Sequence, residues 1–378
     1  MEPESAPSNC NPFRPALPFL KLAAARIKPG LAALLLAMLT AGCTTLDQPS
    51  PSSAATNRFA FAQAQMGLEF RITLFAESEE PAQAAAGAAF SRIAALNSVL
   101  SDYDADSELS HLSAASGTER WVTVSPDLWR VLSEGQRLAS ATEGAFDLTV
   151  GPSVNLWRRV RRQEQLPDAS LLELMRSRVG HLNLELDPVR QAARMLKPEM
   201  RLDAGGIAKG FAMDEAMMVL KSHGVRSAMI QGGGDLIVSE APPGTSGWKV
   251  ALAGLETDPA SMPNPPVLSL ENRALATSGD LFQFVEIDGV RYSHIVDPRT
   301  GIGLTNRILV HVVAPDGMTA DGTSTAASVL GAERGLALAS GLPGVEVQIT
   351  WRVGEEKEQV QSPGFFRSLS AERRTDGN

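Results

Sequence analysis

The feature that most constrains the fold of this chain is a run of strand patterns in its second half. The segments "SAMIQ", "LIVS", "WKVALAG", "FVEID" and "RILVHVVA" follow one another, several of them separated by short loops. Helix patterns occur between strands, but there is no regular strand–helix–strand alternation. This arrangement predicts an α+β fold, with mixed or antiparallel sheets and packed helices. With 378 residues and 44% apolar content, the chain is large enough to form one sizeable domain with its own core.

Helix and strand boundaries are predicted from capping residues and periodicity. Ser125 is a good N-cap with Pro126 in the first helical position, so a helix should run from there to about Thr142. The other predicted helices are Glu79 to about Leu100, the segment 205–224 that opens on glycines, and about Ala320 to Ala339. "LEFRITLFA" and "VEVQITWRV" are predicted strands, and the alternation in "FVEIDGVRY" predicts a strand that ends at Tyr292 or just beyond.

The N-terminal segment is typical of a bacterial secretory signal. Four basic residues precede the apolar run "LAALLLAMLTA", which is too short to span a bilayer as a helix. Gly42-Cys43 follows and resembles a lipobox, although the usual leucine at position −3 is replaced by Thr40. We therefore expect residues 1–42 to be a lipoprotein signal peptide and Cys43 to be the lipidated N-terminus. A membrane-anchored helix is the less favoured alternative.

The predicted mature chain is acidic and contains one thiol. Removal of residues 1–42 leaves 30 Lys and Arg against 41 Asp and Glu, and Cys43 as the only cysteine. This charge argues against nucleic-acid binding, and the single thiol excludes an internal disulfide. Residues 43–57 are predicted to be a flexible tether, 58–366 the folded domain and 367–378 a polar tail. The expected location is the bacterial cell envelope, with a lipid-anchored protein facing the periplasm.

Two segments in the first half of the domain are candidate binding loops. "LSDYDADSELSHL" contains a cluster of acidic residues, for which a solvated loop or an N-cap at Ser107 is the simpler interpretation. "TEGAFDLTVGP" places Phe146 beside Asp147 between two glycine-containing turns. Loops that let the backbone approach a ligand have this composition, but so do ordinary turns.

Two later segments combine helix starts with polar side chains. In "LDAGGIAKG", glycines open a helix whose free N–H groups and Lys209 would suit a phosphate, although the segment is neither a P-loop nor a dinucleotide fingerprint. Asp203 would repel that phosphate unless it bound a metal or ligand donors. In "TADGTSTAASVLG", Asp321 and Thr325 lie four residues apart on one helical face. These hard oxygen ligands suit Mg²⁺, while the alternative is that Asp321 caps the helix.

"SHIVDPRTG" is either a turn or part of a site. Pro298 and Gly301 are good turn residues, and Asp297 is expected to stabilise the turn. His294 stands at the end of the preceding strand pattern. The histidines at positions 111, 181, 223 and 311 have no comparable setting and are expected to be structural.

The order of these segments resembles that of the FAD:protein FMN transferases, the ApbE family. The resemblance covers about residues 59–365, and it departs from the family pattern at Ser113 and Gly322. The matching segments are "MGLEF", "SDYDADSEL", "GAFDLTVGP", "LDAGGIAKGFAMD", "GGGDL", "ATSGD", "HIVDPRTG" and "ADGTSTA".

The resemblance implies a Mg²⁺-dependent enzyme that cleaves FAD and attaches FMN to a threonine of a partner protein, with release of AMP. Family members modify subunits of membrane electron-transfer complexes. By this analogy Asp321, Thr325 and the backbone near Gly206 would hold Mg²⁺, and His294 would be the general base, unless it is a structural histidine. The FAD-binding residues implied by the resemblance are Met66, Tyr103, Ala145, Phe146, Asp147, Asp203, Lys209 and Ile295.

Two alternatives share the same residues. With water as the acceptor, the site would be an FAD pyrophosphatase that produces FMN and AMP. A periplasmic flavin-binding lipoprotein would instead bind FAD tightly without turnover. Turnover in the absence of any partner protein and turnover on addition of Mg²⁺ distinguish these alternatives from a transferase.

Overall fold

The computed structural model describes residues 56–256, 262–281 and 283–366. The predicted signal peptide 1–42, the lipidation site Cys43, most of the tether 43–57 and the tail 367–378 lie outside the described residues. The first strand of the described chain starts at Asn57.

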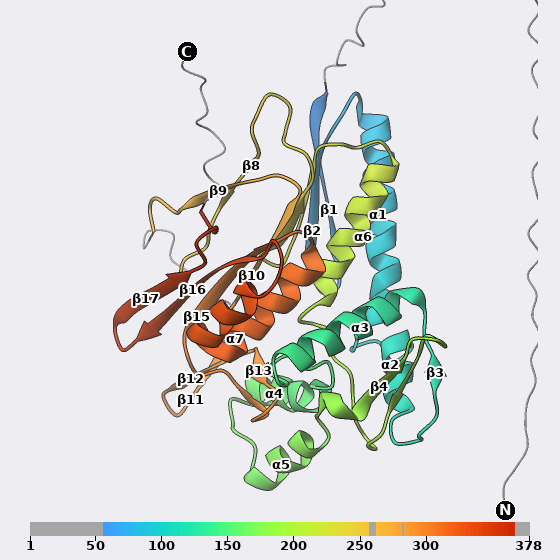
Figure 1. The fold of residues 1–378 in the computed structure, drawn as a ribbon, viewed down its shortest axis with the longest axis vertical. Coiled ribbons are helices and arrows are strands. Elements are labelled where there is room, and N and C mark those ends of the chain that lie inside the picture. The colour runs from blue at the N-terminus through green and yellow to red at the C-terminus, as the bar shows by residue number, and fades with distance from the viewer. Residues whose placement is uncertain (1–55, 257–261, 282, 367–378) are drawn as a thin grey trace, which may run out of the picture. The chain divides into compact units, whose positions relative to one another are not determined.

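An antiparallel sheet of eight strands forms the centre of the fold (Figure 1). Its strand order is β1-β2-β6-β7-β10-β15-β16-β17, and every neighbouring pair is antiparallel. The α+β prediction with antiparallel sheets is therefore confirmed. The strands are β1 Asn57–Gln65, β2 Leu68–Ala76, β6 Ala228–Gly232, β7 Asp235–Val238, β10 Arg273–Gly279, β15 Ile308–Ala314, β16 Glu346–Val353 and β17 Glu356–Gln361.

Three long helices cover one face of this sheet: α1 (Glu79–Leu100), α6 (Ala208–Ser222) and α7 (Gly317–Ser340). They contact one another in the order α1, α6, α7, and α7 also packs on β10, β15 and β16 (Figure 1). Small residues allow this close packing, since alanines make up half of the buried positions of α1. The main core lies between these helices and the sheet.

The opposite face of the sheet is covered in part by the hairpin of β8 (Trp248–Ala251) and β9 (Val267–Leu270). Alternation along β10 shows how both faces are used: Ala274 and Ala276 point to the main core, whereas Leu275 packs with Trp248 in the second core. A sheet buried on both faces explains why β15 is buried at all seven positions.

The remaining elements gather at the lower end of the view in Figure 1. Helix α3 is capped by the Ser125 hydroxyl, which accepts a hydrogen bond from the Leu128 N–H, as the sequence predicts. These elements are α2 Glu108–Ala114, α3 Pro126–Ala141, α4 Gly151–Gln163, α5 Ala169–Ser177, the 3₁₀ helix η1 His181–Asn183, β3 Val122–Thr123, β4 Leu184–Asp187, β5 Ala192–Met195, β11 Phe284–Ile287, β12 Val290–Ser293, β13 Val296–Asp297 and β14 Ile302–Gly303.

Two sequence predictions about this region were wrong. "FVEIDGVRY" is not one strand but the hairpin β11–β12, which reverses at Asp288 and Gly289, both with positive φ. An Asp-Gly pair is the preferred two-residue hairpin turn, and this turn interrupted an otherwise continuous alternation. Helix α4 was not predicted, because the glycine and proline at its start were interpreted as part of a turn, although Pro suits a first helical turn.

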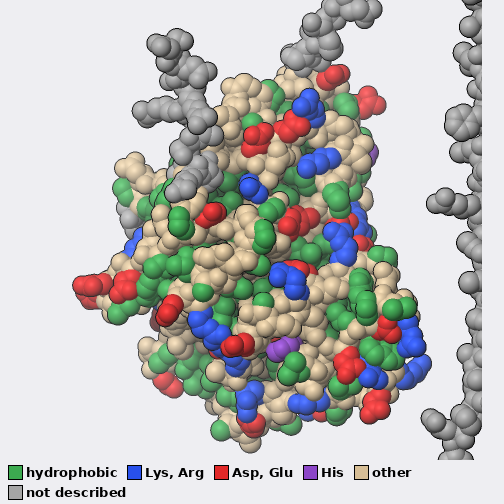
Figure 2. Space-filling view, viewed as in Figure 1, with side chains coloured by type: hydrophobic (Ala, Val, Ile, Leu, Met, Phe, Trp, Pro, Cys, Tyr) green, Lys and Arg blue, Asp and Glu red, His purple; other side chains and the backbone are tan. Residues whose placement is uncertain are grey.

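On the face shown in Figure 2, acidic and basic side chains are interspersed with scattered hydrophobic ones. Within the ranges that the structure describes, none of the helices has the length and apolar character needed to cross a membrane.

Candidate active site

The N-terminal half of α7 lies against the start of α6 and places Asp321 in the interior. Asp321 is 2% exposed, and its Oδ2 accepts a hydrogen bond of 3.0 Å from the Gly210 N–H in the first turn of α6. Asp321 is not the cap of α7, because Asp316 caps that helix by accepting from the Thr319 N–H. The capping alternative is thereby excluded, and a buried carboxylate is left for another role.

Lys209 connects Asp321 to a second buried carboxylate, Asp235. Its Nζ lies 2.8 Å from Asp321 Oδ1 and 3.1 Å from Asp235 Oδ2, and Asp235 also accepts a hydrogen bond from the Thr277 N–H. Burial lowers the pKa of Lys209, but the two carboxylates outweigh it and raise the pKa above its ordinary value. Burial raises the pKa of Asp235 to about 6. Two carboxylates and one ammonium leave an excess of one negative charge when all three are ionised.

The residues expected to bind a metal meet at this cluster. A Cβ on Gly206 would lie 2.9 Å from Thr325 Cγ2 and 3.2 Å from its hydroxyl, so the backbone at Gly206 approaches Thr325 closely. Thr325 is one helical turn from Asp321. The structure therefore brings together a carboxylate, a hydroxyl and a backbone segment, which are hard oxygen donors of the kind that Mg²⁺ prefers. No group of three or more His, Cys, Asp or Glu side chains with metal-ligand geometry occurs among the described residues.

A second charged network surrounds Arg158 of α4. Its guanidinium pairs with the carboxylates of Asp102 and Asp203, and it stacks on the Tyr103 ring at 4.1 Å. Burial, followed by the charge of Asp102, raises the pKa of Asp203 to about 6. The Asp203 carboxylate is paired with the Arg158 guanidinium, and its Oδ1 accepts a hydrogen bond from the Gly205 N–H. Tyr103 is 77% exposed, so one face of a ring in this network is available to a ligand.

The other residues expected to bind FAD lie on three different loops. Met66 is in the turn between β1 and β2, with φ 49°, and Ile295 follows β12. Ala145 and Phe146 are buried, and Phe146 lies against Gly206, since a Cβ there would be 3.3 Å from its ring. These loops are far apart in sequence, and for Phe146 the contact with the metal-site residues is direct.

The Asp147 carboxylate is hydrogen-bonded to neighbouring groups of the protein itself. Its Oδ1 accepts hydrogen bonds of 2.7 Å from both the N–H and the hydroxyl of Thr149, and its Oδ2 accepts from the His181 N–H. Burial raises the pKa of Asp147. The side chain therefore stabilises the loop after Phe146.

His294 is half-buried at the end of β12, and its ring has a defined orientation. Nδ1 lies 3.1 Å from the Gln283 carbonyl oxygen, which can only accept, so Nδ1 carries the proton and Nε2 has a free lone pair. Burial, together with the charges of Arg161 and Lys209, lowers the pKa of His294 to about 4. The imidazole is consequently neutral near pH 7 and able to accept a proton at Nε2.

The "DPRTG" segment is a turn, as expected for Asp297. The Asp297 carboxylate accepts from the backbone N–H of Arg299 and pairs with its guanidinium, while Gly301 takes φ 74°. The carbonyl of Ser293, the residue before His294, accepts a hydrogen bond of 2.8 Å from Trp157 Nε1. The tryptophan of α4 thereby fixes the backbone directly before His294.

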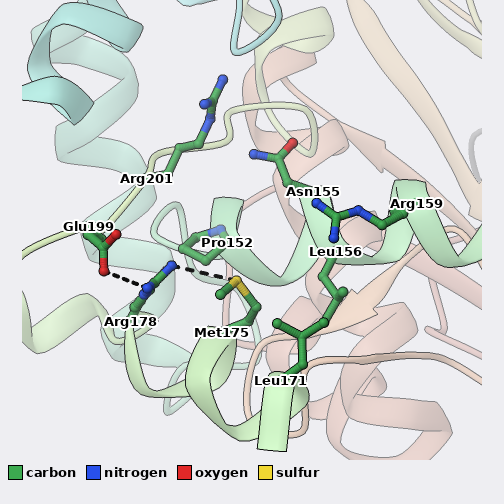
Figure 3. Close-up of a pocket in the computed structure, with 9 residues that line it drawn as sticks. All are labelled: Pro152, Asn155, Leu156, Arg159, Leu171, Met175, Arg178, Glu199 and Arg201. Atoms are coloured by element: carbon green, nitrogen blue, oxygen red, sulfur yellow. Dashed lines mark hydrogen bonds and ion pairs between the residues drawn. The ribbon is translucent and has the colours of Figure 1, made fainter. Parts of the chain in front are cut away.

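Two cavities of about 200 Å³ each lie near these elements, and neither is lined by His294 or Asp321. The first lies between α4 and α5, and Figure 3 shows its Arg178 guanidinium between Glu199 and Met175. The second lies beside the "DPRTG" turn and is lined in part by Asp147, His181 and Pro298. The lining of the second cavity brings together the loop that follows Phe146 and the turn that follows His294.

Sequence reasoning missed three charged residues of the site: Asp235, Asp102 and Arg158. The segment "GGGDL" matches the family pattern, but the resemblance implies no role for its aspartate, and the composition around Asp102 favours a solvated loop. Three consecutive glycines before an aspartate were the available signal for Asp235, since they mark a turn that presents it at the start of β7. Arg158 had no local signal, because helix α4 was not predicted.

Comparisons with known proteins show the family of this chain. The model of the ApbE family matches residues 66–349. An FAD:protein FMN transferase of Vibrio cholerae serotype O1 is 36% identical over 249 residues, which are 65% of this chain and 72% of that protein. One of Klebsiella pneumoniae is 29% identical over 344 residues, 89% of this chain and 96% of that protein.

Solved structures of similar proteins share the fold. The flavin transferase ApbE from Vibrio cholerae superposes with a TM-score of 0.74 at 28% identity, covering 83% of this chain and 99% of that chain. The apo form of the Pseudomonas stutzeri flavinyl transferase ApbE superposes with a TM-score of 0.72 at 27% identity, covering 84% of this chain and 98% of that chain.

Proposed function

Because this chain belongs to the ApbE family and is an FAD:protein FMN transferase, we propose that it uses Mg²⁺ to cleave FAD and attaches FMN through a phosphoester to a threonine of a partner protein. The observation that carries this proposal is the buried cluster of Asp321, Lys209 and Asp235, with Thr325 and Gly206 beside it. Phosphoryl transfer depends mainly on positioning and on neutralising charge, and this cluster offers both.

Asp321, Thr325 and the backbone at Gly206 would hold Mg²⁺. The excess negative charge of the buried cluster favours a cation, and Asp321 would exchange its contact with Lys209 for the metal. When bound, the ion neutralises charge on the phosphate oxygens of FAD. Lys209 would remain beside the site, because Asp235 holds it independently of Asp321.

His294 would act as the general base. Its Nε2 takes the proton of the threonine hydroxyl while the threonine oxygen attacks the phosphorus of the FMN half. The bond from this phosphorus to the bridging oxygen breaks, and AMP leaves with that oxygen. The neutral imidazole, with Nδ1 bonded to the Gln283 carbonyl, is in the protonation state that this step requires.

The metal proposal is tested with Asp321→Ala. We expect the variant to fold and to lose Mg²⁺-dependent release of AMP from FAD, because Thr325 and a backbone group do not hold the ion alone. Metal binding should be measured directly as well, by titration with Mn²⁺ followed by electron paramagnetic resonance. Glu333→Ala is the matched control, since Glu333 is exposed on the same helix. Normal Mn²⁺ affinity in Asp321→Ala would contradict the proposed ligand set.

The acceptor is proposed to be a threonine on a subunit of a membrane electron-transfer complex. Mass spectrometry of such a subunit, expressed with and without this protein, should find FMN on a threonine only in the co-expressed sample. Rapid release of AMP and FMN from FAD with no acceptor present would instead support the pyrophosphatase alternative. Tight FAD binding without turnover in the presence of Mg²⁺ and acceptor would support a flavin-binding lipoprotein.

We also propose that Cys43 is lipidated and anchors the enzyme to a membrane of the cell envelope, facing the periplasm. The support is the charged and apolar sequence before Cys43, followed by a tether rich in Pro, Ser and Thr. Cys43→Ser should release the protein from membranes. Retention of this variant on membranes after a salt wash would contradict the lipid anchor.

A further inference from the structure

Helix α4 carries four arginines, at positions 158, 159, 161 and 162, although the whole chain has a net charge of −9. Arg158 is neutralised by Asp102 and Asp203. Within residues 56–256, 262–281 and 283–366, no ion pair satisfies Arg159, Arg161 or Arg162. Helix α4 therefore carries three cations that no described carboxylate compensates.

Arg161 differs from the other two unpaired arginines in its burial. Arg159 and Arg162 are exposed, so water satisfies their N–H groups. Arg161 is partly buried, and its Nε is inaccessible to solvent and has no hydrogen-bond acceptor in the described part of the chain. Burial accordingly lowers the pKa of Arg161. A buried N–H donor without an acceptor is costly and uncommon in native proteins, and a bound water or ion is one way of satisfying it.

Two contacts of α4 show that the helical face carrying Arg161 meets Tyr103 and the residue before His294. Trp157, four residues earlier and therefore on the same helical face, donates to the carbonyl of Ser293, which directly precedes His294. Arg158, three residues earlier, stacks on Tyr103. The field of Arg161 also reaches His294, because it contributes to lowering the pKa of that histidine.

We propose that Arg161 is a substrate-binding residue that pairs with a phosphoryl oxygen on the FMN half of FAD. This inference rests on the proposed function only in that FAD is the substrate. The guanidinium is planar and its two-pronged donor geometry matches phosphate.

The charge balance of the site favours phosphate as the partner. A pyrophosphate brings two negative charges, yet Lys209 is already paired with Asp235 and Asp321, and Arg158 with Asp102 and Asp203. In the absence of metal, carboxylates therefore already compensate the charges of Lys209 and Arg158. Arg161 is a partly buried cation whose charge affects His294 and which no described carboxylate compensates, so it is available to neutralise the incoming phosphate.

The test compares binding of three flavins to the purified protein, without Mg²⁺ and without acceptor. Flavin fluorescence is used to titrate FAD, FMN and riboflavin, and the last of these has no phosphate. Loss of a charge-assisted hydrogen bond costs about 1.5–3 kcal/mol, so Arg161→Gln should weaken FAD and FMN binding by roughly 10- to 150-fold. Riboflavin binding should not change. Arg161→Lys should recover part of the affinity, and Arg162→Gln is the matched control on the exposed side of the helix.

Each other result contradicts the proposal in a recognisable way. Unchanged FAD affinity in Arg161→Gln, with a higher KM for the acceptor, would mean that Arg161 contacts the partner protein instead of FAD. An equal loss of riboflavin affinity would place it against the flavin ring. Loss of binding in step with a lower melting temperature, not recovered in Arg161→Lys, would make the residue structural. Because no transfer or metal is involved, the result stands whether or not threonine is the acceptor and Mg²⁺ the cofactor.

Discussion

Gly210 of α6 and Gly317 of α7 are in direct backbone contact: a Cβ on Gly210 would lie 2.0 Å from the Gly317 carbonyl oxygen and 2.9 Å from the Asp321 Cβ. The two helices can approach this closely only because neither residue has a side chain. The contact allows the Gly210 N–H to reach the Asp321 carboxylate, so the geometry of the candidate metal site depends on it.

Gly210→Ala should therefore separate α6 from α7. Overpacking of this kind costs about 1–3 kcal/mol, and Mn²⁺ affinity should fall as Asp321 moves. Chemical denaturation and metal titration on the same preparation measure both effects. Gly87→Ala in α1 is the control, because a Cβ there meets nothing within 4 Å and alanine should stabilise the helix by about 0.5–1 kcal/mol. A Gly210→Ala variant as stable as wild type would show that the helices adjust without cost.

Asp214→Ala should loosen the start of α7. The Asp214 carboxylate accepts hydrogen bonds from the N–H groups of Gly317, at 2.6 Å, and Met318, at 2.8 Å, in the first turn of that helix. Loss of a helix-terminus acceptor costs about 0.5–2 kcal/mol. Hydrogen exchange should detect faster opening at residues 317–320. Unchanged exchange there would mean that Asp316 alone secures the helix start.

His294→Gln should bind FAD with near-normal affinity and transfer FMN about 10²- to 10⁴-fold more slowly, since only the proton acceptor is lost. The pKa of His294 is about 4, so the base is deprotonated well above that pH and the wild-type rate should fall only as the pH drops toward 4. The measurement is a pH–rate profile from 4 to 8, together with a titration of FAD. If stability, FAD affinity and rate decline together, His294 is structural.

His311→Leu should stabilise the protein. His311 is 1% exposed, and neither ring nitrogen has a hydrogen-bond partner among the described residues. An unsatisfied buried polar group costs about 1–3 kcal/mol. Denaturant midpoints of the variant and wild type at pH 7.5 give this difference directly. A less stable variant would indicate that the imidazole contributes more by packing than its unpaired nitrogens cost.

Wild type and His311→Leu also test how the stability of the protein depends on pH. Burial lowers the pKa of His311 from its ordinary 6.5 to about 4. Between these values the folded state binds fewer protons than the unfolded state, so wild type loses stability as pH falls from about 6.5 to 4. The leucine variant lacks this loss, and the stability gap should widen at pH 5 compared with pH 7.5. A constant gap would mean that the histidine titrates normally.

The sequence by itself determined the elements and turns that depend on neighbouring residues. Ser125 caps α3 and Asp297 fixes its turn because a side-chain acceptor and the N–H groups it satisfies lie within three residues. The succession of strand patterns established the α+β class, and the ordered motifs led to the ApbE family. These features are local, or are sums of local features, so they can be recognised before the chain is folded.

Only the tertiary structure decided which charges meet and which remain unpaired. Lys209 and Asp321 are 112 residues apart, and Arg158 reaches Asp102 across 56 residues. The strand order, the close approach of α6 to α7 and the unpredicted helix α4 bring these side chains together. An ion pair in the interior depends on the burial and distance of both partners, and neither quantity exists until the sheet and helices have packed. For this reason the sequence indicated Asp321 and His294 as site residues. It did not indicate that Lys209 and Arg158 form ion pairs with buried carboxylates, whereas Arg161 has no described carboxylate partner.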